Sequence, residues 1–365
     1  MIKVLEAFDS LEISGGVQAV VMNIFRAMDH EKVHMDFAVY ENPKENSYDQ
    51  EIIHRGGKVI PVSNLSACGF GKFYQQFYNL LKQGNYDIVH AHNIHHNGLI
   101  LLAAKNADVP IRISHSHQAF DERNTTFLRR MMVACLKIIN NRVATRRVAC
   151  SDLAGKFLYG KRPFEFLPNA VNLERFDIQE SKDELREKFG IPKEEKVLVH
   201  IGRFSLQKNQ FFMIDIMNEL RSENCILYMV GDGSLFDEFN NKVKEKQLEE
   251  KIKCLGLRND VPRLLKMADC MLLPSIYEGL PMVAVEAQAI GCFSFLSDVI
   301  TRQADLGLGL LEYLSIKNAS LWAEKIKDFA AGKPIPPSEI KQKMVERKFD
   351  VQANLSAWYQ LYGVE

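Results

Sequence analysis

Short apolar runs alternate with longer segments of helical period along the chain. Six runs in the first half have the length and composition of buried parallel strands: Lys3–Ala7, Met35–Tyr40, Lys58–Val62, Tyr86–His92, Ile111–His117 and Arg147–Cys150. Between them, three segments have the spacing of amphipathic helices: Val17–Met28, Lys72–Gln83 and roughly Asn124–Asn141. This alternation predicts an α/β fold with a doubly wound parallel sheet.

The pattern starts again in the second half of the chain. Five further strands are predicted, at Val197–Arg203, Cys225–Gly233, Ile252–Gly256, Cys270–Ser275 and Cys292–Asp298, and helical stretches begin near Lys208, Ser234, Asp260 and Pro281. Pro168 and Asn169 interrupt the pattern before a charged helix that ends near Gly190, so we place the junction around residues 167–176. The sequence therefore predicts two domains in tandem, residues 1–172 and 173–347, with ligands at the carboxyl ends of the strands.

Length and composition agree with this organisation. The 365 residues exceed what one hydrophobic core usually covers. Lysine plus arginine and aspartate plus glutamate both number 46, and this zero net charge argues against a nucleic-acid partner. Seven scattered cysteines without C-x-x-C spacing indicate a reducing compartment, the cytoplasm. Charges in the first 16 residues argue against a signal peptide, and no run of about eighteen residues stays apolar, so we expect a soluble protein.

Two glutamates eight positions apart, Glu278 and Glu286, lie on either side of a predicted strand-to-helix turn. The residues of this turn are Gly279, Leu280, Pro281 and Met282. Pro281 suits the first position of the helix, whose free N–H groups and dipole favour an anion such as a diphosphate. A carboxylate accepts two hydroxyls at once, which suits Glu278 to a sugar diol and Glu286 to a ribose. Alone, the two glutamates are equally typical of a solvated helix start.

A second cluster of candidate residues follows the first predicted strand of the second domain. The strand ends in Gly202 and Arg203, and a loop leads to Lys208 at a predicted helix start. The planar fork of Arg203 can hold two phosphate oxygens, and Lys208 adds a point charge. The pair could neutralise charge on a departing nucleoside diphosphate. Either base alone is commonly a surface charge, but two clusters on one sheet favour a binding site.

Three further turns follow predicted strands, and their residues are Gly15 and Gly16, Gly231 and Gly233, and Leu257 and Arg258. The bare backbone of the first turn could approach a phosphate or a sugar, although the dinucleotide fingerprint G-x-G-x-x-G is missing. We assign the second a supporting role near the nucleotide and the third a role in holding its base. Ordinary chain geometry explains the glycines equally well.

Nine of the ten histidines precede residue 120. They include His90 and His92 at one strand end, His95 and His96 just after it, and His115 and His117 at the next. Side chains at the ends of adjacent parallel strands converge, so His115 or His117 could contact a transferred sugar. A zinc site is the other interpretation, but such a site normally shows tighter patterning of its ligands.

The chain contains no Asp-x-Asp motif. Hard divalent cations that carry a diphosphate are usually held by such carboxylates. Arg203, Lys208 and the helix start would then replace the cation, so we predict that the protein needs no metal and no other cofactor.

The segment 123–147 contains seven bases and no acid, interleaved with apolar residues. The bases are Arg123, Arg129, Arg130, Lys137, Arg142, Arg146 and Arg147. Such a basic amphipathic helix could lie on an anionic membrane surface, where lipid-linked acceptors are found. A packed helix with a solvated basic face is the alternative.

Together these motifs resemble the retaining glycosyltransferases of family 4, which have the GT-B fold. The likeness covers nearly the whole chain and is carried by Ser14-Gly15-Gly16, Gly202-Arg203 with Lys208, Gly231-Asp232-Gly233, Pro274-Ser275 and Glu278-x7-Glu286. It is similar in particular to bacterial enzymes that build capsular polysaccharides, exopolysaccharides or lipopolysaccharide cores. The resemblance implies two Rossmann-like domains that face each other across a cleft, and a C-terminal helix, residues 348–365, that packs back on the first domain.

The resemblance also implies roles for individual residues. In that family the residues that match Glu278 and Glu286 contact the donor sugar and the ribose, and those that match Arg203 and Lys208 contact the diphosphate. The family also uses a histidine at the end of a strand in the first domain, for which His117 is favoured over His115.

The implied activity is the transfer of a hexose or N-acetylhexosamine, with retention of configuration, from a nucleotide sugar to a glycan or lipid-linked saccharide acceptor. UDP is preferred as the nucleotide from its frequency in the family. Two alternatives stay open, a nucleotide-sugar epimerase of the same architecture and a noncatalytic sugar-binding protein. No second carboxylate pair for epimerase chemistry is evident in the first domain, and the intact charged residues of the second argue against loss of catalysis.

Overall fold

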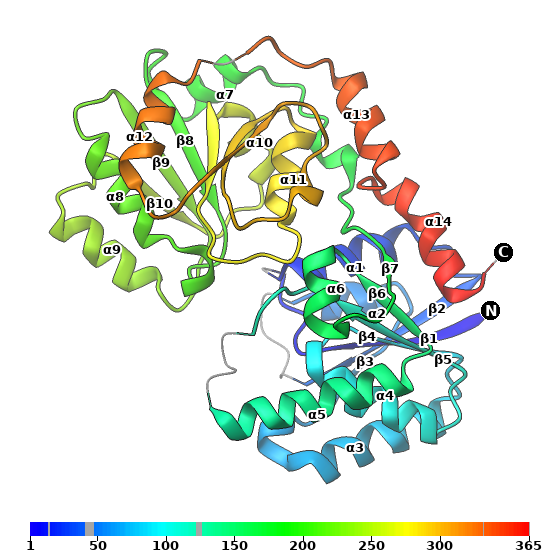
Figure 1. The fold of residues 1–365 in the computed structure, drawn as a ribbon. Coiled ribbons are helices and arrows are strands. Elements are labelled where there is room, and N and C mark those ends of the chain that lie inside the picture. The colour runs from blue at the N-terminus through cyan, green and yellow to red at the C-terminus, as the bar shows by residue number, and fades with distance from the viewer. Residues whose placement is uncertain (14, 41–46, 122–125, 331, 365) are drawn as a thin grey trace. The chain divides into compact units, whose positions relative to one another are not determined.

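The computed structural model describes residues 1–13, 15–40, 47–121, 126–330 and 332–364. The chain forms two compact units (Figure 1). The first unit comprises Met1–Ala170 and Val351–Glu365, and the second comprises Val171–Asp350. The divisions expected from the sequence, at 172/173 and 347/348, lie two and three residues from these boundaries.

The first unit contains a seven-stranded sheet with the order β3-β2-β1-β4-β5-β6-β7, in which all neighbours are parallel. The strands are β1 (Ile2–Phe8), β2 (Val33–Val39), β3 (Val59–Pro61), β4 (Ile88–Ala91), β5 (Ile111–Ser116), β6 (Arg146–Ala149) and β7 (Glu165–Phe166). The strand order runs outward from β1 to β3 and then from β4 in the other direction. The topological switch point of this sheet therefore lies between β1 and β4.

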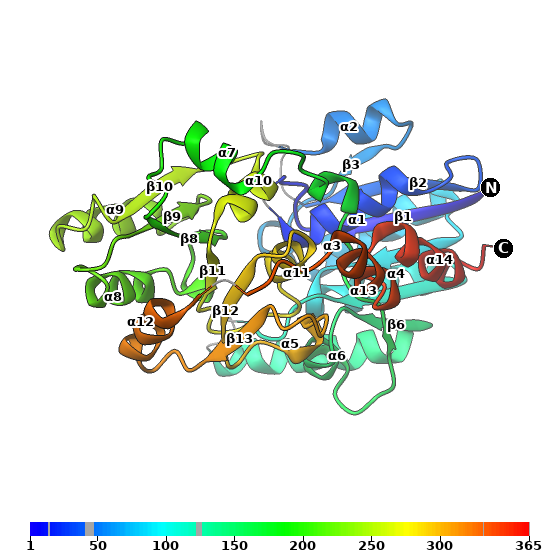
Figure 2. The ribbon, with the colours of Figure 1, turned by 90° about the horizontal axis from the view of Figure 1, so that it is seen from above.

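Helices cover both faces of this sheet. They are α1 (Gly16–Ala27), α2 (Asp49–His54), α3 (Leu65–Gly84), the short 3-10 turn η1 (Ile94–His96), α4 (Asn97–Asn106), α5 (Phe127–Val143), α6 (Asp152–Tyr159) and α14 (Val351–Tyr362). Apolar residues of α1, α2 and α14 form one core with the sheet, and those of α3, α4 and α5 form the other. The last helix lies against the first one (Figures 1 and 2). The chain end thus completes the first unit, because Trp358 and Tyr362 of α14 are fully buried there.

The second unit contains a six-stranded parallel sheet with the order β10-β9-β8-β11-β12-β13. The strands are β8 (Lys196–Ile201), β9 (Cys225–Val230), β10 (Ile252–Gly256), β11 (Cys270–Leu273), β12 (Phe293–Ser297) and β13 (Leu311–Leu314). The order repeats that of the first sheet, so the switch point lies between β8 and β11.

The helices of the second unit also lie on both faces of its sheet (Figure 2). They are η2 (Leu173–Phe176), α7 (Lys182–Lys188), η3 (Leu206–Lys208), α8 (Phe211–Glu219), α9 (Phe236–Glu245), α10 (Val261–Met267), α11 (Met282–Ala289), η4 (Arg302–Ala304), α12 (Ala319–Asp328) and α13 (Pro337–Glu346). Residues of α8, α9 and α12 form a core against the sheet, whereas α10 contacts both α7 and α11 on the other face.

The structure confirms the predicted strands in their order and adds two short edge strands, β7 and β13, whose lengths give little periodic signal. Helix α4 was not predicted because most of its residues are buried, so it lacks a polar face. Helix α11 begins at Met282, one residue later than expected, and Pro281 is its N-cap instead of its first residue. Within the described ranges, none of the helices has the length and apolar character needed to cross a membrane.

Candidate active site

The two charged clusters predicted for the second domain meet in the structure. Lys208 and Glu278 form an ion pair, with 2.7 Å between Nζ and Oε1. Lys208 ends η3, which follows β8, and Glu278 lies on the loop between β11 and α11. Because β8 and β11 are neighbours at the switch point, this pair lies where doubly wound sheets bind ligands.

Glu278 is buried, with 6% of its surface exposed, and is held by three donors. Besides Lys208, Ser275 Oγ donates to Oε1 at 2.7 Å and Gln207 Nε2 donates to Oε2 at 3.3 Å. The backbone N–H of Ile276 donates to Gln207 O at 2.8 Å, which joins the two loops. A carboxylate offers roughly four acceptor positions, so Glu278 keeps about one, on Oε2, for a ligand.

A buried histidine on β8 supports the Lys208 loop. His200 Nδ1 donates to Leu272 O at 2.9 Å, and Gln210 Nε2 lies 3.3 Å from His200 Nε2 and 2.8 Å from Arg203 O. Burial lowers the pKa of His200 to about 4. The charge of Lys208 also lowers this pKa, whereas the backbone hydrogen bond to Leu272 acts to raise it. His200 is therefore neutral at pH 7, and its unprotonated Nε2 accepts from Gln210.

Gly202 and the Gly231–Gly233 turn pack backbone against backbone. Phe204 N donates to Asp232 O at 2.9 Å, and a Cβ on Gly231, whose φ is +134°, would collide with Gly202 O. A Cβ on Gly202 would in turn lie 3.3 Å from Cδ and Cε of Lys208. These glycines therefore let the Lys208 side chain and two loops approach closely. The Arg203 side chain, next to Gly202, is exposed.

Glu286 is the fifth residue of α11 and is half-buried. Burial raises the pKa of Glu286, while the charges of Arg175 and Lys208 act in the opposite direction. Lys208 thus influences both predicted glutamates. Arg175 was missed from the sequence because it lies on η2, a short element that packs against α11 from a distant part of the chain.

Leu257 and Arg258 follow β10, two strands away from β8 in the same sheet. Leu257 is exposed, and Arg258 forms its own ion pair with Asp260 at 2.6 Å. The structure therefore places these two residues at the predicted edge of the sheet without bringing them into contact with the Lys208–Glu278 pair.

In the first unit, the four predicted histidines gather at the carboxyl ends of β4 and β5. His90 Nε2 lies 3.1 Å from His115 Nδ1, and His92 Nδ1 lies 2.9 Å from His117 Nε2. Glu6 on β1 accepts from His92 at 2.7 Å. Sequence reasoning missed this role of Glu6, although a single carboxylate within an apolar strand is an unusual feature.

Ligand atoms of His90, His92 and His115 lie within 4.8 Å of one another, close enough for a metal ion. Five of the six ring nitrogens of these residues take part in hydrogen bonds, including one between His90 Nδ1 and Tyr362 Oη, and His115 Nε2 has no partner among the described residues. A metal would have to replace protons in that chain, because each neutral imidazole has only one lone pair.

Gly15 and Gly16 form the start of α1, with Gly15 as N-cap. Gly15 N donates to Glu12 O at 3.0 Å, and the amide of Gln18 folds over the turn and donates to Ser10 O at 3.1 Å. A tight turn accounts for these contacts. The first residue of the predicted motif, Ser14, lies outside the described residues.

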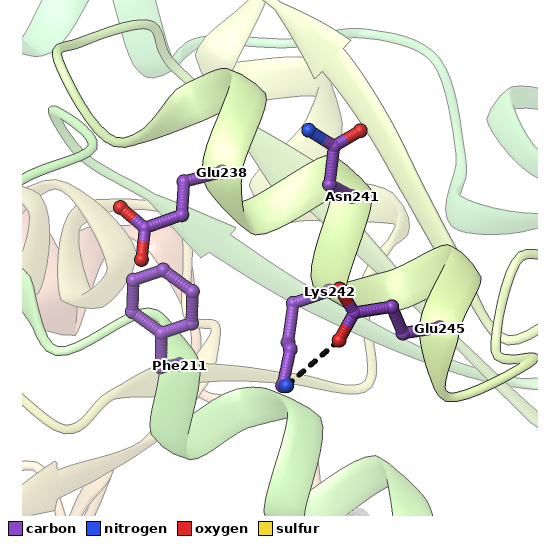
Figure 3. Close-up of a pocket in the computed structure, with 5 residues that line it drawn as sticks. All are labelled: Phe211, Glu238, Asn241, Lys242 and Glu245. Carbon is purple, nitrogen blue, oxygen red and sulfur yellow. Dashed lines mark hydrogen bonds and ion pairs between the residues drawn. The ribbon is translucent and has the colours of Figure 1, made fainter.

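A hollow on the surface of the second unit is lined by none of the predicted site residues (Figure 3). It is lined by Phe211, Glu238, Asn241, Lys242 and Glu245 of α8 and α9. Its one base, Lys242, is paired with Glu245 at 2.8 Å. The hollow carries more acid than base and none of the predicted residues, so it is a poor site for a diphosphate.

The fold and the site define a class of protein. Residues 181–331 match the family model described as glycosyl transferases group 1, and residues 14–175 match the model of glycosyltransferase family 4. The chain belongs to this family and is a glycosyltransferase.

Similar proteins agree with this assignment. The EpsF protein of Bacillus subtilis (strain 168) is 34% identical over 361 residues, 96% of this chain and 94% of its own. The Escherichia coli enzyme UDP-Gal:alpha-D-GlcNAc-diphosphoundecaprenol alpha-1,3-galactosyltransferase is 27% identical over 79% of this chain and 78% of its own. The crystal structure of Anabaena HepE in complex with UDP and glucose matches with a TM-score of 0.80, 16% identity and 100% coverage of both chains. The two Rossmann-like units therefore have the GT-B fold.

Proposed function

We propose that this protein is a retaining glycosyltransferase of surface polysaccharide biosynthesis. It transfers a hexose or N-acetylhexosamine from a UDP-sugar to a glycan or lipid-linked saccharide acceptor. The observation that carries the proposal is the Lys208–Glu278 ion pair of 2.7 Å at the switch point of the second sheet. Support for the substrates comes from the Escherichia coli relative, named for a UDP-sugar donor and a diphosphoundecaprenol acceptor, and from the UDP in the HepE structure.

In this proposal the second unit holds the donor. Arg203 and Lys208, with the first amides of α11, bind the diphosphate and neutralise its charge as it leaves. Glu278 accepts a sugar hydroxyl through its remaining position, and Glu286 accepts the hydroxyls of the ribose. Further donor contacts come from the turns Gly15–Gly16, Gly202, Gly231–Gly233, Leu257–Arg258 and Gly279–Met282.

The chemistry needs no protein nucleophile. The acceptor hydroxyl forms the new bond to the anomeric carbon from the face that the diphosphate leaves, as the bond to the diphosphate oxygen breaks. A phosphate oxygen takes the hydroxyl proton. His117, with His115 as the second candidate, contacts the transferred sugar.

A donor screen tests this proposal. The purified protein is incubated with UDP-glucose, UDP-galactose, UDP-N-acetylglucosamine and GDP-mannose, and thermal stabilisation and nucleotide release are measured. We expect one or more UDP-sugars to raise Tm and to release UDP slowly to water, and the α-anomer to persist in the product when an acceptor is supplied. An epimerised donor without acceptor would identify an epimerase, and stabilisation by free sugars alone would identify a sugar-binding protein.

We also propose that catalysis is independent of metal, because Arg203 and Lys208 supply the positive charge at the diphosphate. Turnover should be unchanged after dialysis against EDTA. Loss of activity that Mg²⁺ alone restores would contradict this proposal, and loss that Zn²⁺ restores would point to the His90, His92 and His115 group.

Helix α5 is the proposed contact with an anionic membrane. Phe127, Leu128, Met131 and Ile138 are each more than half exposed. Of the bases in segment 123–147, Arg130 and Arg142 are exposed on this helix, whereas Lys137 donates to Phe157 O and Arg147 to Asn141 O. Arg123 lies outside the described residues. The helix therefore offers more apolar surface and less free charge than the sequence suggests, so insertion of apolar side chains contributes more than electrostatic attraction.

Co-sedimentation with vesicles tests this contact. We expect binding to phosphatidylglycerol vesicles that weakens severalfold in Leu128→Ser. Ile53→Ser is the matched control, because Ile53 on α2 is also about half exposed and lies outside α5. Equal binding of both variants would exclude α5 as the contact.

A further inference from the structure

A buried chain of hydrogen bonds crosses the carboxyl ends of β1, β4 and β5 in the first unit. Glu6 Oε2 lies 2.7 Å from His92 Nε2, and His92 Nδ1 lies 2.9 Å from His117 Nε2. The other oxygen of Glu6 accepts from Tyr362 Oη at 2.6 Å. All four side chains are buried. The chain ends at His117 Nδ1, a buried atom with no hydrogen-bond partner among the described residues.

Glu6 fixes where the proton of His92 lies. Burial acts to raise the pKa of Glu6, but His90 and His92 outweigh it and hold the pKa well below its usual value. Glu6 is therefore ionised and can only accept hydrogen bonds. Burial and the charge of His90 lower the pKa of His92 to about 4, so His92 is neutral at pH 7. Its single proton must lie on Nε2, facing Glu6, which leaves a lone pair on Nδ1.

That lone pair decides the tautomer of His117. Burial and the proximity of the titratable rings of His92 and His90 hold the pKa of His117 well below its usual value, so it too has a single proton. This proton lies on Nε2 and is donated to His92, and Nδ1 is left as an acceptor. Asn169 is buried beside His117, and its side chain acts to raise the pKa of His117, although neither Asn169 Oδ1 nor His117 Nδ1 reaches hydrogen-bond geometry with a described residue. A buried acceptor without a donor is unfavourable, so His117 Nδ1 is suited to a ligand that donates.

We propose that Glu6 is a positioning residue that acts through His92 to hold His117 as a hydrogen-bond acceptor for a sugar hydroxyl. The inference rests on the proposed function and deepens it, because it fixes the direction of the hydrogen bond: the hydroxyl donates. An acceptor at His117 Nδ1 matches the O–H donor of a sugar. It disfavours a fully ionised phosphate, which has no proton to donate.

A second branch of the chain offers a matched control. Tyr362 Oη lies 3.0 Å from His90 Nδ1, and His90 Nε2 lies 3.1 Å from His115 Nδ1. This branch does not pass through His92. Tyr362→Phe therefore removes a hydrogen bond to Glu6 but leaves the proton arrangement between His92 and His117 unchanged.

NMR of the full chain with ¹⁵N-labelled histidine reads the tautomer directly. His117 is assigned by the loss of its signals in His117→Gln. In the wild type and in Tyr362→Phe we expect a pyridine-type Nδ1 and a protonated Nε2 at neutral pH. In Glu6→Gln the charged acceptor becomes an amide that can also donate, so His117 should populate both tautomers. A protonated Nδ1 in the wild type, which needs no variant to fold, would overturn the inference.

Binding provides the second readout. Glu6→Gln should weaken the affinity for the UDP-sugar selected by the donor screen by about tenfold, the effect of one hydrogen bond, and leave the affinity for UDP unchanged. Tyr362→Phe should lose less UDP-sugar affinity. Equal losses for UDP and UDP-sugar would indicate a structural role for Glu6 and overturn the inference. A wild-type protein that binds no nucleotide sugar would instead overturn the proposed function, while NMR would still decide the tautomer.

Discussion

Lys208 interacts electrostatically with two carboxylates that differ in their surroundings. It contacts Glu278 directly at 2.7 Å and opposes the rise in the pKa of Glu286 at longer range. A leaving diphosphate would compete with Glu278 for the same ammonium group. The ion pair therefore holds Lys208 in place, so that its ammonium group can interact with the diphosphate without a large movement of the side chain.

Lys208→Ala should reduce kcat by about 100-fold or more, because a charged group is lost where negative charge develops. Steady-state kinetics with a UDP-sugar and an acceptor measure this effect. Lys242→Ala is the matched control, since Lys242 is also paired with a glutamate but lies on α9 away from the site. A kcat within a few-fold of the wild type would remove Lys208 from the catalytic residues.

The neutral His200 makes the second unit sensitive to acid. Its pKa is about 4 in the folded chain against an ordinary value of 6.5, so the unfolded chain takes up a proton first as the pH falls. The resulting stabilisation is complete above pH 6.5 and is lost progressively down to about 4, by about 3 kcal/mol in total. Urea unfolding between these pH values should show this loss. The pH dependence should be shallower in His200→Gln, and equal slopes would contradict the assignment.

At the scale of elements, the site depends on loops that meet tightly. The loop after β8 and the turn after β9 touch through Gly202 and Gly231, and the loop after β11 is joined to the first by Ile276 N and Gln207 O. The positions of Arg203 and Lys208 are thus set by backbone packing as well as by their own contacts.

Gly231→Ala should destabilise the second unit by about 1–3 kcal/mol, because the added Cβ meets Gly202 O and the backbone has a φ of +134°. Gly16→Ala is the control, since a Cβ there meets nothing within 4 Å at the start of α1. Chemical denaturation of both variants measures the difference. Comparable stability of the two would show that the loops relax without cost.

The sequence predicted the elements better than their contacts. Alternating strands and helices gave both sheets, and Glu278 and Lys208 were recognised because turns after strands carried unusual charge. Their pairing could not be predicted, because it depends on β8 and β11 being neighbours although α8 to α10 separate them in the chain. His200 and Glu6 were missed as site residues for the same reason, because each acts through a partner distant in sequence. Ser275 was recognised only as part of the Pro274-Ser275 motif, although its partner Glu278 is three residues away.

At the scale of the whole molecule, the C-terminal helix belongs to the unit in which the chain begins. Trp358, Leu355 and Leu361 of α14 pack with residues of α1, β1 and β2 in one core. Tyr362 belongs to the same core, and its hydroxyl donates a hydrogen bond to Glu6. The helix therefore contributes to packing and to the buried polar chain at once.

Trp358→Ala should destabilise the first unit by about 3–5 kcal/mol, as expected for a large cavity in a packed core. The second unit should keep its stability, because it has a separate core. Calorimetry should then show the transition of one unit shifted to lower temperature, while UDP still stabilises the other. A uniform shift of a single transition would mean that the units unfold together.

The hydrogen bond from Tyr362 to Glu6 connects two residues that are 356 positions apart in the sequence. During synthesis, β1 leaves the ribosome well before α14. The Glu6 carboxylate therefore lacks its hydrogen bond from Tyr362 until the second unit has been synthesised. The first unit therefore completes its core later than the second, and the enzyme acquires its complete buried polar chain only once α14 has been synthesised.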